Sequence, residues 1–363
     1  MFRPPAIAIV ATVFLNVASF ATTSAKPYAV GNCAPNLQSY PSISVAVSSV
    51  PAGSTVLVCP GNYPEQVLIT QALTLKGVLV GGSDAAVVTV PSGGLSQSVT
   101  DHFGNTVFYQ ILVQNTAGPV NITNLGVDGT GASAPGGFLA GIFYYEASGT
   151  LSSVTTRNQT SSTQSGDAIL AQSFGSAQTL TVQSSSVRGF DGGGISAFTD
   201  LTTPLLTATI KGNRVRGNDV SGAGIFLDGA TGTVQSNIVT DASEALGLVG
   251  SAATVTANTL SGVSANPYTV YIQSGSNTLK GNKIDAAGRY GVQLVFAGTN
   301  VIELNTIVDS STAVYGCYNS VSGNTVTGNT IVDAGVGVSL PSGNTFHPNI
   351  FSVVGTAVAT CLG

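Results

Sequence analysis

The sequence predicts an all-β chain that folds as one right-handed parallel β-helix, a solenoid of about 11–12 coils with a short N-terminal capping helix. An asparagine recurs in the second half of the chain at intervals of 21 to 24 residues, and this period indicates stacked supersecondary units. The series is Asn213, Asn237, Asn258, Asn282, Asn305 and Asn329. About ten residues after each lies an alternating apolar run such as YTVYI or YGVQL, which is typical of a strand.

The recurring asparagines have a structural explanation. Asparagine tolerates the left-handed conformation at a tight turn, and its amide can bond to a neighbouring coil. Because crossovers between parallel strands are right-handed, we expect these side chains to line one column of turns in a right-handed helix. They are expected to form a ladder and not a ligand site.

Composition suits this fold and argues against others. Only 7% of the 363 residues are charged and 45 are glycines, which excludes a charged disordered segment or a coiled coil. The repeated leucine pattern of leucine-rich repeats is missing. Because 43% of the residues are hydrophobic, the stack can bury a continuous core, and we expect one elongated domain.

The N-terminus has the pattern of a signal peptide. Arg3 precedes an apolar run over residues 6–20, and small residues end at Ala25, where we expect cleavage. The run is too short for a membrane span, and no other segment approaches its length. Loss of Arg3 leaves 10 basic and 16 acidic residues, a net charge of −6, which argues against nucleic acid or an anionic membrane as partner. The expected segments are a signal peptide (1–25), a cap with the first coil (26–80) and β-helix repeats (81–363).

All four cysteines follow the expected signal peptide. An even number in an exported chain suggests disulfides, and we predict the pairs Cys33–Cys59 and Cys317–Cys361. Both pairs would lie at the ends of the solenoid, where open strand edges otherwise fray or aggregate. Free buried thiols are the alternative. No CxxC spacing indicates a metal site.

The N-terminal stretch carries a family resemblance. Residues 41–50 could form a short covering helix with Ser42 as N-cap, and strands are expected to follow. The matching positions are Ile43, Ala46, Val47, Gly53, Val56, Val58, Pro60, Gly61, Tyr63, Glu65, Val67, Ile69, Leu73, Thr74, Leu75 and Gly77. This pattern resembles the first module of the pectin-lyase-like superfamily, which pectin methylesterases and periplasmic NosD-like proteins share. The resemblance implies an exported β-helix, often one that binds or acts on acidic polysaccharides.

The catalytic motifs of the known enzymes with this fold are not recognisable here. The aspartate motif of pectin methylesterases, the HG and RIK motifs of polygalacturonases and the arginine motif of pectate lyases are all missing. The NosD-like resemblance could suggest copper, but the only methionine is Met1 and the only histidines are His102 and His347, each expected in a loop. No cofactor is therefore predicted, apart from calcium as an option considered below.

One repeated phrase is a candidate catalytic cluster. Val-Arg-Gly-x-Asp occurs twice, 28 residues apart, so Arg188 should lie near Arg216, and Asp191 near Asp219. Two arginines beside two carboxylates could hold a uronate, tune a base, or bind calcium through Asp191 and Asp219. The alternative is a structural ladder of ion pairs, favoured by further aspartates near the same turn.

Outward positions of the second strand run form a candidate binding stripe. Side chains alternate along a strand, so residues beside the inward aliphatics should be exposed. The stripe comprises Phe143, Tyr145, Phe198, Phe226, Asp228, Tyr271, Gln273, Gln293 and Tyr315. Aromatic rings flanked by amides and carboxylates suit an extended sugar chain. A covering loop, or a register shifted by one residue, is the alternative.

The sequence thus favours a secreted, periplasmic or cell-surface β-helix, expected to be a monomer, that binds an extended and acidic polysaccharide. A polysaccharide lyase or glycoside hydrolase using the same face is the second hypothesis, and a structural or adhesive solenoid is the third. The irregular segment 81–110 is expected to be a long loop or a widened coil, where function often lies.

Overall fold

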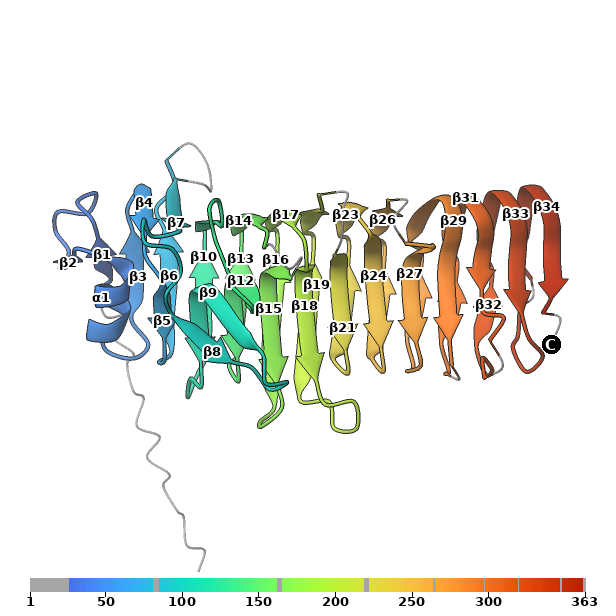
Figure 1. Cartoon of the computed structure of the whole chain (residues 1–363), viewed down its shortest axis with the longest axis horizontal. Coiled ribbons are helices and arrows are strands. Elements are labelled where there is room, and N and C mark those ends of the chain that lie inside the picture. Colours follow the sequence, from blue (N-terminus) through green and yellow to red (C-terminus); the bar gives the residue numbers. More distant parts are fainter. Residues whose placement is uncertain are drawn as a thin grey trace, which may run out of the picture.

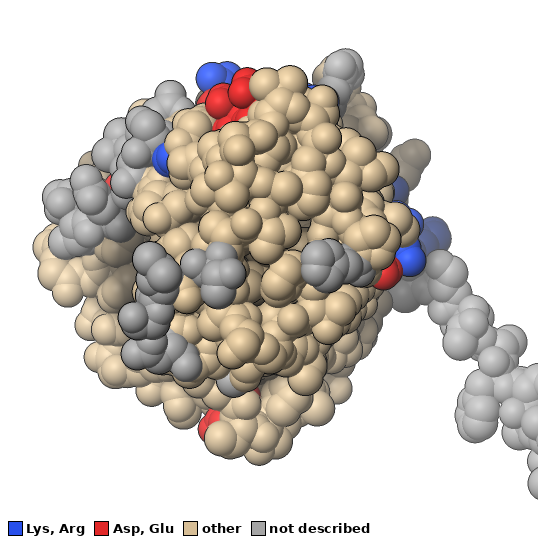
Figure 2. All heavy atoms as spheres, turned by 90° about the vertical axis from the view of Figure 1, so that its right-hand side faces the viewer, with Lys and Arg blue, Asp and Glu red and all other residues tan. Residues whose placement is uncertain are grey.

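The computed structural model describes residues 26–80, 85–161, 165–218, 222–263, 266–296, 298–318, 320–346 and 348–361. These residues form a rod of coils stacked from the N-terminal helix to the last strand (Figure 1). The expected signal peptide, Asp219 and His347 lie outside the described residues. Within the described ranges, no helix is both long and apolar enough to cross a membrane. The C-terminal end of the rod is mostly uncharged, with acidic and basic side chains near its rim (Figure 2).

Each coil contributes strands to three faces, and each strand pairs in parallel with its counterpart in the next coil. Face A consists of β1 (Tyr28–Val30), β2 (Ser39–Tyr40), β3 (Thr55–Val58), β6 (Leu73–Gly77), β10 (Val120–Thr123), β13 (Gly149–Ser152), β16 (Gln178–Gln183), β19 (Leu206–Lys211), β22 (Thr231–Gln235), β25 (Ala252–Thr256), β28 (Thr278–Lys280), β30 (Val301–Glu303) and β32 (Thr325–Thr327). Face B consists of β4 (Gly61–Pro64), β7 (Ala86–Thr89), β11 (Gly126–Asp128), β14 (Thr155–Gln159), β17 (Ser186–Phe190), β20 (Arg214–Arg216), β23 (Ile238–Ala242) and β26 (Thr259–Gly262).

Face C, which carries the candidate stripe, is the third. It consists of β5 (Val67–Ile69), β9 (Thr106–Gln114), β12 (Phe138–Tyr145), β15 (Gly166–Ser173), β18 (Gly193–Thr199), β21 (Ala223–Asp228), β24 (Glu244–Val249) and β27 (Tyr268–Gln273). In the last coils β29 (Lys283–Val295), β31 (Thr306–Tyr315), β33 (Thr330–Leu340) and β34 (Ile350–Thr360) run through both B and C. Among the pairings of described strands, only that of β8 (Ser98–Thr100) with β9 is antiparallel. The chain is therefore a right-handed parallel β-helix, as predicted, and the described strands agree with about 11–12 coils.

The first coil is covered by helix α1 (Ile43–Ser49), which confirms the predicted capping helix. The side chain of Ser42 accepts a hydrogen bond from Val45 N, as expected of an N-cap. The Glu65 carboxylate adds two bonds from the first turn, accepting from Ile43 N at 2.9 Å and Ser44 N at 2.8 Å. The apolar side of α1 packs on a single core that continues inside the coils to β33.

The predicted asparagines do line one column, at the bend between faces A and B, and Asn349 extends it. In each step the backbone N–H and the side-chain Nδ2 of one asparagine donate to Oδ1 of the next. Between Asn237 and Asn258 these distances are 2.8 and 3.0 Å. The second hydrogen on Nδ2 is donated to a backbone carbonyl of the preceding coil, as from Asn258 to Val234 O at 2.9 Å. Each buried amide thereby satisfies its oxygen and both of its N–H groups.

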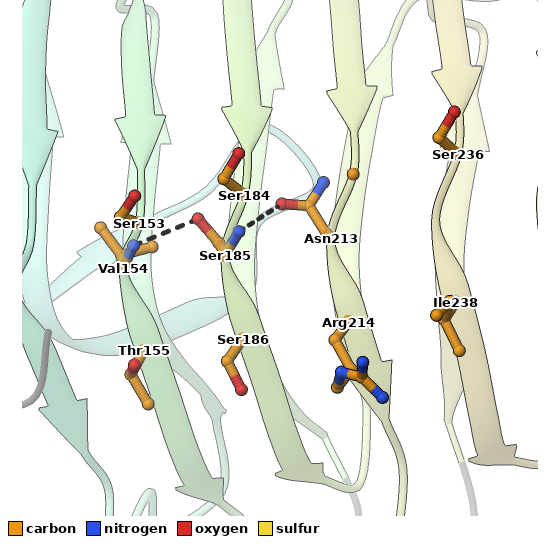
Figure 3. Close-up of a pocket in the computed structure, with 11 residues that line it drawn as sticks. Ser153, Val154, Thr155, Ser184, Ser185, Ser186, Asn213, Arg214, Ser236 and Ile238 are labelled. Atoms are coloured by element: carbon orange, nitrogen blue, oxygen red, sulfur yellow. Dashed lines mark hydrogen bonds between the residues drawn. The ribbon is translucent and has the colours of Figure 1, made fainter. Parts of the chain in front are cut away.

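At its N-terminal end the ladder passes from Asn213 to Ser185 (Figure 3). Asn213 Oδ1 accepts a bond from Ser185 N at 3.0 Å, and the Ser185 hydroxyl accepts one from Val154 N at 3.2 Å. Outside this bend lies a hollow of about 330 Å³ lined by further serines and Arg214. Because the Ser185 hydroxyl and the Asn213 amide already serve the ladder, we interpret the hollow as part of the turn architecture.

The expected left-handed asparagines need a correction. The positive φ belongs to the residue before each ladder position, which is Ser184, Gly212, Ser236, Ala257, Gly281, Leu304 or Gly328. The asparagine itself must keep its amide inside the bend, so the preceding residue makes the turn. In the phrases KGN, QSN and ELN the middle residue therefore makes the turn and the asparagine supplies the ladder amide. A second ladder, missed in the sequence, joins Asn277, Asn300, Asn324 and Asn344 at the bend between faces C and A.

Both predicted disulfides are present, Cys33–Cys59 in the first coils and Cys317–Cys361 at the far end. The alternative of free thiols does not hold, since no cysteine of the described residues is free. Each bond ties a terminal strand to the stack and constrains the unfolded chain.

We predict that Asn258→Ala destabilises the protein by at least about 3 kcal/mol, because it leaves Asn237 N–H, Asn237 Nδ2 and Asn282 Oδ1 short of a partner inside the bend. Denaturant unfolding of the purified variant measures this loss. Thr254→Ala, an exposed change in the same coil, is the control and should stay within about 0.5 kcal/mol of the parent. Equal stabilities of the two variants would contradict the ladder's contribution.

Candidate functional site

The outward side chains of face C lie in columns, since the strands are in register. The central column includes Phe143, Leu170, Ser196, Phe226, Tyr271, Gln293 and Tyr315. Two residues further along each strand, a second column includes Tyr145, Gln172, Phe198, Asp228 and Gln273. The structure thus brings all nine residues of the predicted stripe onto one face.

Two members of the stripe are not exposed, which corrects the sequence-based expectation. Phe143 is 0% exposed, because Tyr109 of β9 and Val99 of β8 pack with it outside the core of the coils. It lies in a second apolar cluster that also includes Tyr109 and Leu170. Gln293 is buried as well, and its Nε2 donates to the Tyr318 hydroxyl at 2.6 Å. The other seven are partly exposed.

The exposed rings of face C form a row that we name the aromatic track. It comprises Phe103, Phe198, Phe226, Tyr268, Tyr271, Tyr290, Tyr315 and Tyr318. Phe198 lies 5.7 Å from Phe226, and Tyr268 lies 4.9 Å from Tyr271, measured between ring centroids. The Tyr271 hydroxyl donates to Gln273 Oε1 at 2.7 Å. These contacts hold the rings in defined orientations on a rigid sheet.

A buried carboxyl, Asp167, borders the track on the side facing the bend to face B. Its Oδ1 accepts a 2.7 Å bond from the Ser196 hydroxyl. Burial raises the pKa of Asp167 to about 7 and the nearby charge of Asp191 adds to the rise, while the bonds from Ser196 and the Gly193 backbone oppose it. A Cβ at position 193 would lie 2.3 Å from Asp167 Oδ1, so only glycine leaves room for this arrangement.

Asp167 lies between two adjoining pockets of about 180 and 280 Å³. Phe138 and Phe198 line both pockets. The smaller also contains Asp101, and the larger extends to Phe226 at the start of the track. A carboxyl that is partly protonated near neutral pH in such a place can donate or accept a proton.

Glu244 is a second buried carboxyl, in the column of outward side chains that contains Asp167, Gly193 and Ala223. It is 7% exposed, and its Oε1 is buried without a hydrogen-bond partner. Burial raises the pKa of Glu244 to about 8. Burial, followed by the charge of Glu244, also raises the pKa of Tyr268 to about 12. An unpartnered acid between the rings of a rigid surface is costly, which marks it as a functional candidate.

The two carboxyls cannot act on one glycosidic bond. The register runs from Asp167 through Gly193 and Ala223 to Glu244, a span of three coils. At a strand spacing of about 4.8 Å the separation is roughly 14 Å. Pairs of carboxyls that cleave a glycosidic bond lie about 5–9.5 Å apart. Asp167 and Glu244 are therefore two separate features of the face.

Sequence reasoning missed both acids although a signal exists. In the two coils between them the outward residue two positions before the first inward aliphatic of face C is small, Gly193 and Ala223, and in the two coils after Glu244 it is Tyr268 and Tyr290. The segments SGDAI and SEALG place an acid at that position. Comparison of equivalent positions between coils would have identified Asp167 and Glu244.

The described residues of the candidate Arg/Asp cluster lie outside face C. Arg188 and Arg216 are register neighbours on face B, as the spacing predicted. Arg216 Nε bonds Asp241 Oδ2 at 2.6 Å on the surface. Asp191 turns inward, where its carboxylate accepts bonds from Ser161 N and Gly166 N, both at 2.7 Å. In this arrangement Asp191 holds the turn that leads into β15.

Comparisons with known proteins support the fold. Residues 185–358, slightly less than half of the chain, match the family model described as periplasmic copper-binding protein (NosD). No curated protein sequence matches the chain. The A-module of mannuronan C-5 epimerase AlgE4 from Azotobacter vinelandii has a TM-score of 0.57 at 14% identity and covers 87% of this chain and 90% of that one. The GH136 lacto-N-biosidase of Eubacterium ramulus has a TM-score of 0.61 at 14% identity, with 93% and 68% covered.

A Dettilon tailspike protein is similar at a TM-score of 0.54 and 13% identity, with 85% of this chain and 63% of that chain covered. At such identities the likeness shows the fold. Together with the geometry above, it shows that the chain is a right-handed parallel β-helix.

The copper named by the matched family model finds no suitable donors here. The described residues contain no group of three or more His, Cys, Asp or Glu placed to hold a metal ion. The four cysteines are in disulfides, and the ring of His102 stacks on Phe174 at 3.8 Å. The described residues therefore do not fit copper.

The buried acid Glu244 predicts a pH-dependent stability. Between its unfolded pKa of 4.5 and its folded pKa of about 8, the unfolded chain releases a proton that the folded chain keeps. Stability should fall as pH rises through this window, by up to about 1.4 kcal/mol per pH unit. Glu244→Gln should remove this fall, so the variant should gain on the parent towards pH 8 and lose that advantage near pH 4.5.

Melting temperatures of both proteins across this pH range measure the difference. Glu303→Gln, on the surface of face A beside Lys280, is the control and should follow the parent. Parallel curves for Glu244→Gln and the parent would show that the acid is not buried as described.

Proposed function

We propose that face C binds an extended polysaccharide along the aromatic track. The observation that carries this proposal is the row of partly exposed rings on face C from β18 to β31, which is interrupted at the coil of β24, where Gly247 takes the central position. Aromatic faces stack on the apolar faces of sugar rings, while the flanking amides and carboxyls can bond the hydroxyls. A row that extends along the stack of coils suits a ligand that is itself an extended polymer.

The charges of this face favour an uncharged glycan over the acidic one that the sequence suggested. Among the described residues of β12, β15, β18, β21, β24 and β27 there is no lysine or arginine. A uronate chain along β15 to β24 would lie against Asp167, Asp228 and Glu244, and those strands hold no cation to balance it; the nearest one described on this face is Arg289 of β29, which bonds Tyr268 O. Arg188 and Arg216, which the sequence offered as a possible clamp for a uronate, lie on face B.

The comparisons support a carbohydrate ligand in a general way. The similar structures include a mannuronan epimerase and a lacto-N-biosidase, so this fold serves carbohydrate chemistry in other proteins. Two disulfides, and a family model described as periplasmic, support a protein that acts outside the cytoplasm. An exported protein would meet glycans of a cell wall or surface.

A second candidate function is glycan cleavage. Asp167, with its raised pKa, faces the same small pocket as Asp101. Asp167 could supply a general acid to a sugar held in this pocket, whereas the Asp101 carboxylate accepts four hydrogen bonds that hold the hairpin turn and Gln172. Release of reducing ends from a bound glycan, lost in Asp167→Asn while affinity persists, would support this candidate over binding alone.

We predict that Phe226→Ala with Tyr271→Ala weakens glycan binding roughly tenfold or more, since each stacked ring contributes about 0.5–1.5 kcal/mol. The fold should persist because both side chains point away from the core. A panel of neutral and acidic polysaccharides, measured by calorimetry with the parent, identifies the ligand class, and the variants follow on the best binder.

Two controls localise the effect. Tyr40→Ala removes a ring that lies on face A, and Arg216→Ala removes a cation on face B. Neither should change affinity. Loss of binding in Arg216→Ala, with the double variant unaffected, would place the site on face B instead.

A further inference from the structure

The aromatic track is closed at one end by a hairpin. It consists of β8, the first half of β9 and the turn 101–105 between them. Figure 1 shows this segment crossing the strands of face C near β12 and β15. Val99 and Tyr109 of the hairpin pack on Phe143 and Leu170 beneath it. The hairpin thus covers the outer face of two coils.

The base of the hairpin is fixed by the buried side chain of Gln66 in the first coils. Its Oε1 accepts bonds from Ser96 N at 2.7 Å and Gln97 N at 2.9 Å. Its Nε2 donates to Tyr109 O at 2.7 Å, and the Tyr109 hydroxyl bonds Gln97 Oε1 at 2.8 Å. The Gln66 side-chain amide therefore joins both strands of the hairpin to the first coils of the β-helix.

The tip of the hairpin is fixed to β15. Gln172 Nε2 donates to Asp101 Oδ2 at 3.2 Å, and Gln172 Oε1 accepts a bond from His102 N at 3.4 Å. The ring of His102 stacks on Phe174, with ring centroids 3.8 Å apart and planes within 1°. With both base and tip attached, the hairpin is a fixed wall across face C.

This wall forms one side of the pocket at Asp167. Asp101, Phe103 and Asn105 of the tip line the smaller pocket opposite Asp167 and Phe198. Phe103 is 55% exposed and lies 6.1 Å from Phe198, so it is the first ring of the track. Towards β31 the described strands of face C carry no second antiparallel hairpin. The track is therefore walled beside Asp167 and open in the other direction.

We propose that the hairpin makes this protein specific for glycan ends, with the Asp167 pocket holding the terminal sugar and the rest of the chain lying along β21 to β31. This inference rests on the proposed function of face C. A terminal sugar carries a free hydroxyl where an internal sugar carries a glycosidic bond, and Asp167 lines the pocket in which that hydroxyl would lie. An internal sugar would require the glycan to pass through the hairpin.

The test is the number of protein molecules that saturate one polymer chain. Unbranched pullulan, β-1,4-mannan and alginate, each in short, medium and long fractions, serve as probes in sedimentation and light-scattering titrations. End recognition predicts one protein per chain at every length, so cutting a long fraction raises the capacity per mass in proportion to the ends created. Capacity per mass that is independent of chain length would overturn the inference and leave the proposed function standing.

Two variants open the wall. A variant with residues 101–105 replaced by a short glycine turn should bind several molecules per long chain, because the glycan can then continue across face C. Gln172→Ala releases the tip without shortening the chain and should shift the capacity in the same direction. Leu68→Ala, an exposed change beyond the hairpin, is the matched control and should keep one protein per chain.

The outcomes separate the two proposals. Unchanged capacity in both wall variants, with folding verified by their melting curves, would overturn the hairpin's role in end recognition. Absence of binding to every probe by the parent would overturn the proposed function and this inference with it.

Discussion

The structure depends on hydrogen-bond satisfaction of the amides buried at its bends. Backbone N–H and C=O groups at a bend inside the stack have no access to water. Each one left without a hydrogen-bond partner costs about 1–3 kcal/mol. The asparagine ladder removes this cost coil by coil, since each Oδ1 serves the backbone and side chain of the preceding asparagine. Because one amide bonds two coils, the position of one bend determines that of the next. The columns of face C follow from this repetition.

Against such regularity the departures are informative. Glu244 brings an unpartnered acid to a position that holds Gly193 and Ala223 in the two preceding coils, and Asp167 fits as it does because a glycine lies beside it. The hairpin departs from the repeat as well, and it is attached to face C at the same coil as Asp167. Costly departures that all lie on one face are expected of a functional surface and not of a purely structural solenoid. This grouping makes a ligand site on face C the more economical explanation.

The sequence predicted most of what repeats, apart from the second asparagine ladder, and missed the features that occur once. The asparagine period predicted the ladder, and the alternation of strand residues placed Phe226 and Tyr271 outward, because periodic patterns report local geometry directly. Burial of Phe143 could not be read from its own strand, since the cover comes from a hairpin encoded some 40 residues earlier. Asp191 likewise resembled Asp219 by phrase, yet its carboxylate serves backbone groups of the previous coil. Contacts between distant segments determine such roles.

Hydroxyl-radical footprinting of the tyrosines tests the central claim that face C holds the ligand. Tyr271 and Tyr315 lie on the aromatic track, whereas Tyr40 lies on face A and reports any general change in reactivity. At a saturating concentration of the best-binding glycan, we predict reduced labelling of Tyr271 and Tyr315 with unchanged labelling of Tyr40. Unchanged labelling of the track at saturation, or protection confined to faces A and B, would contradict the account.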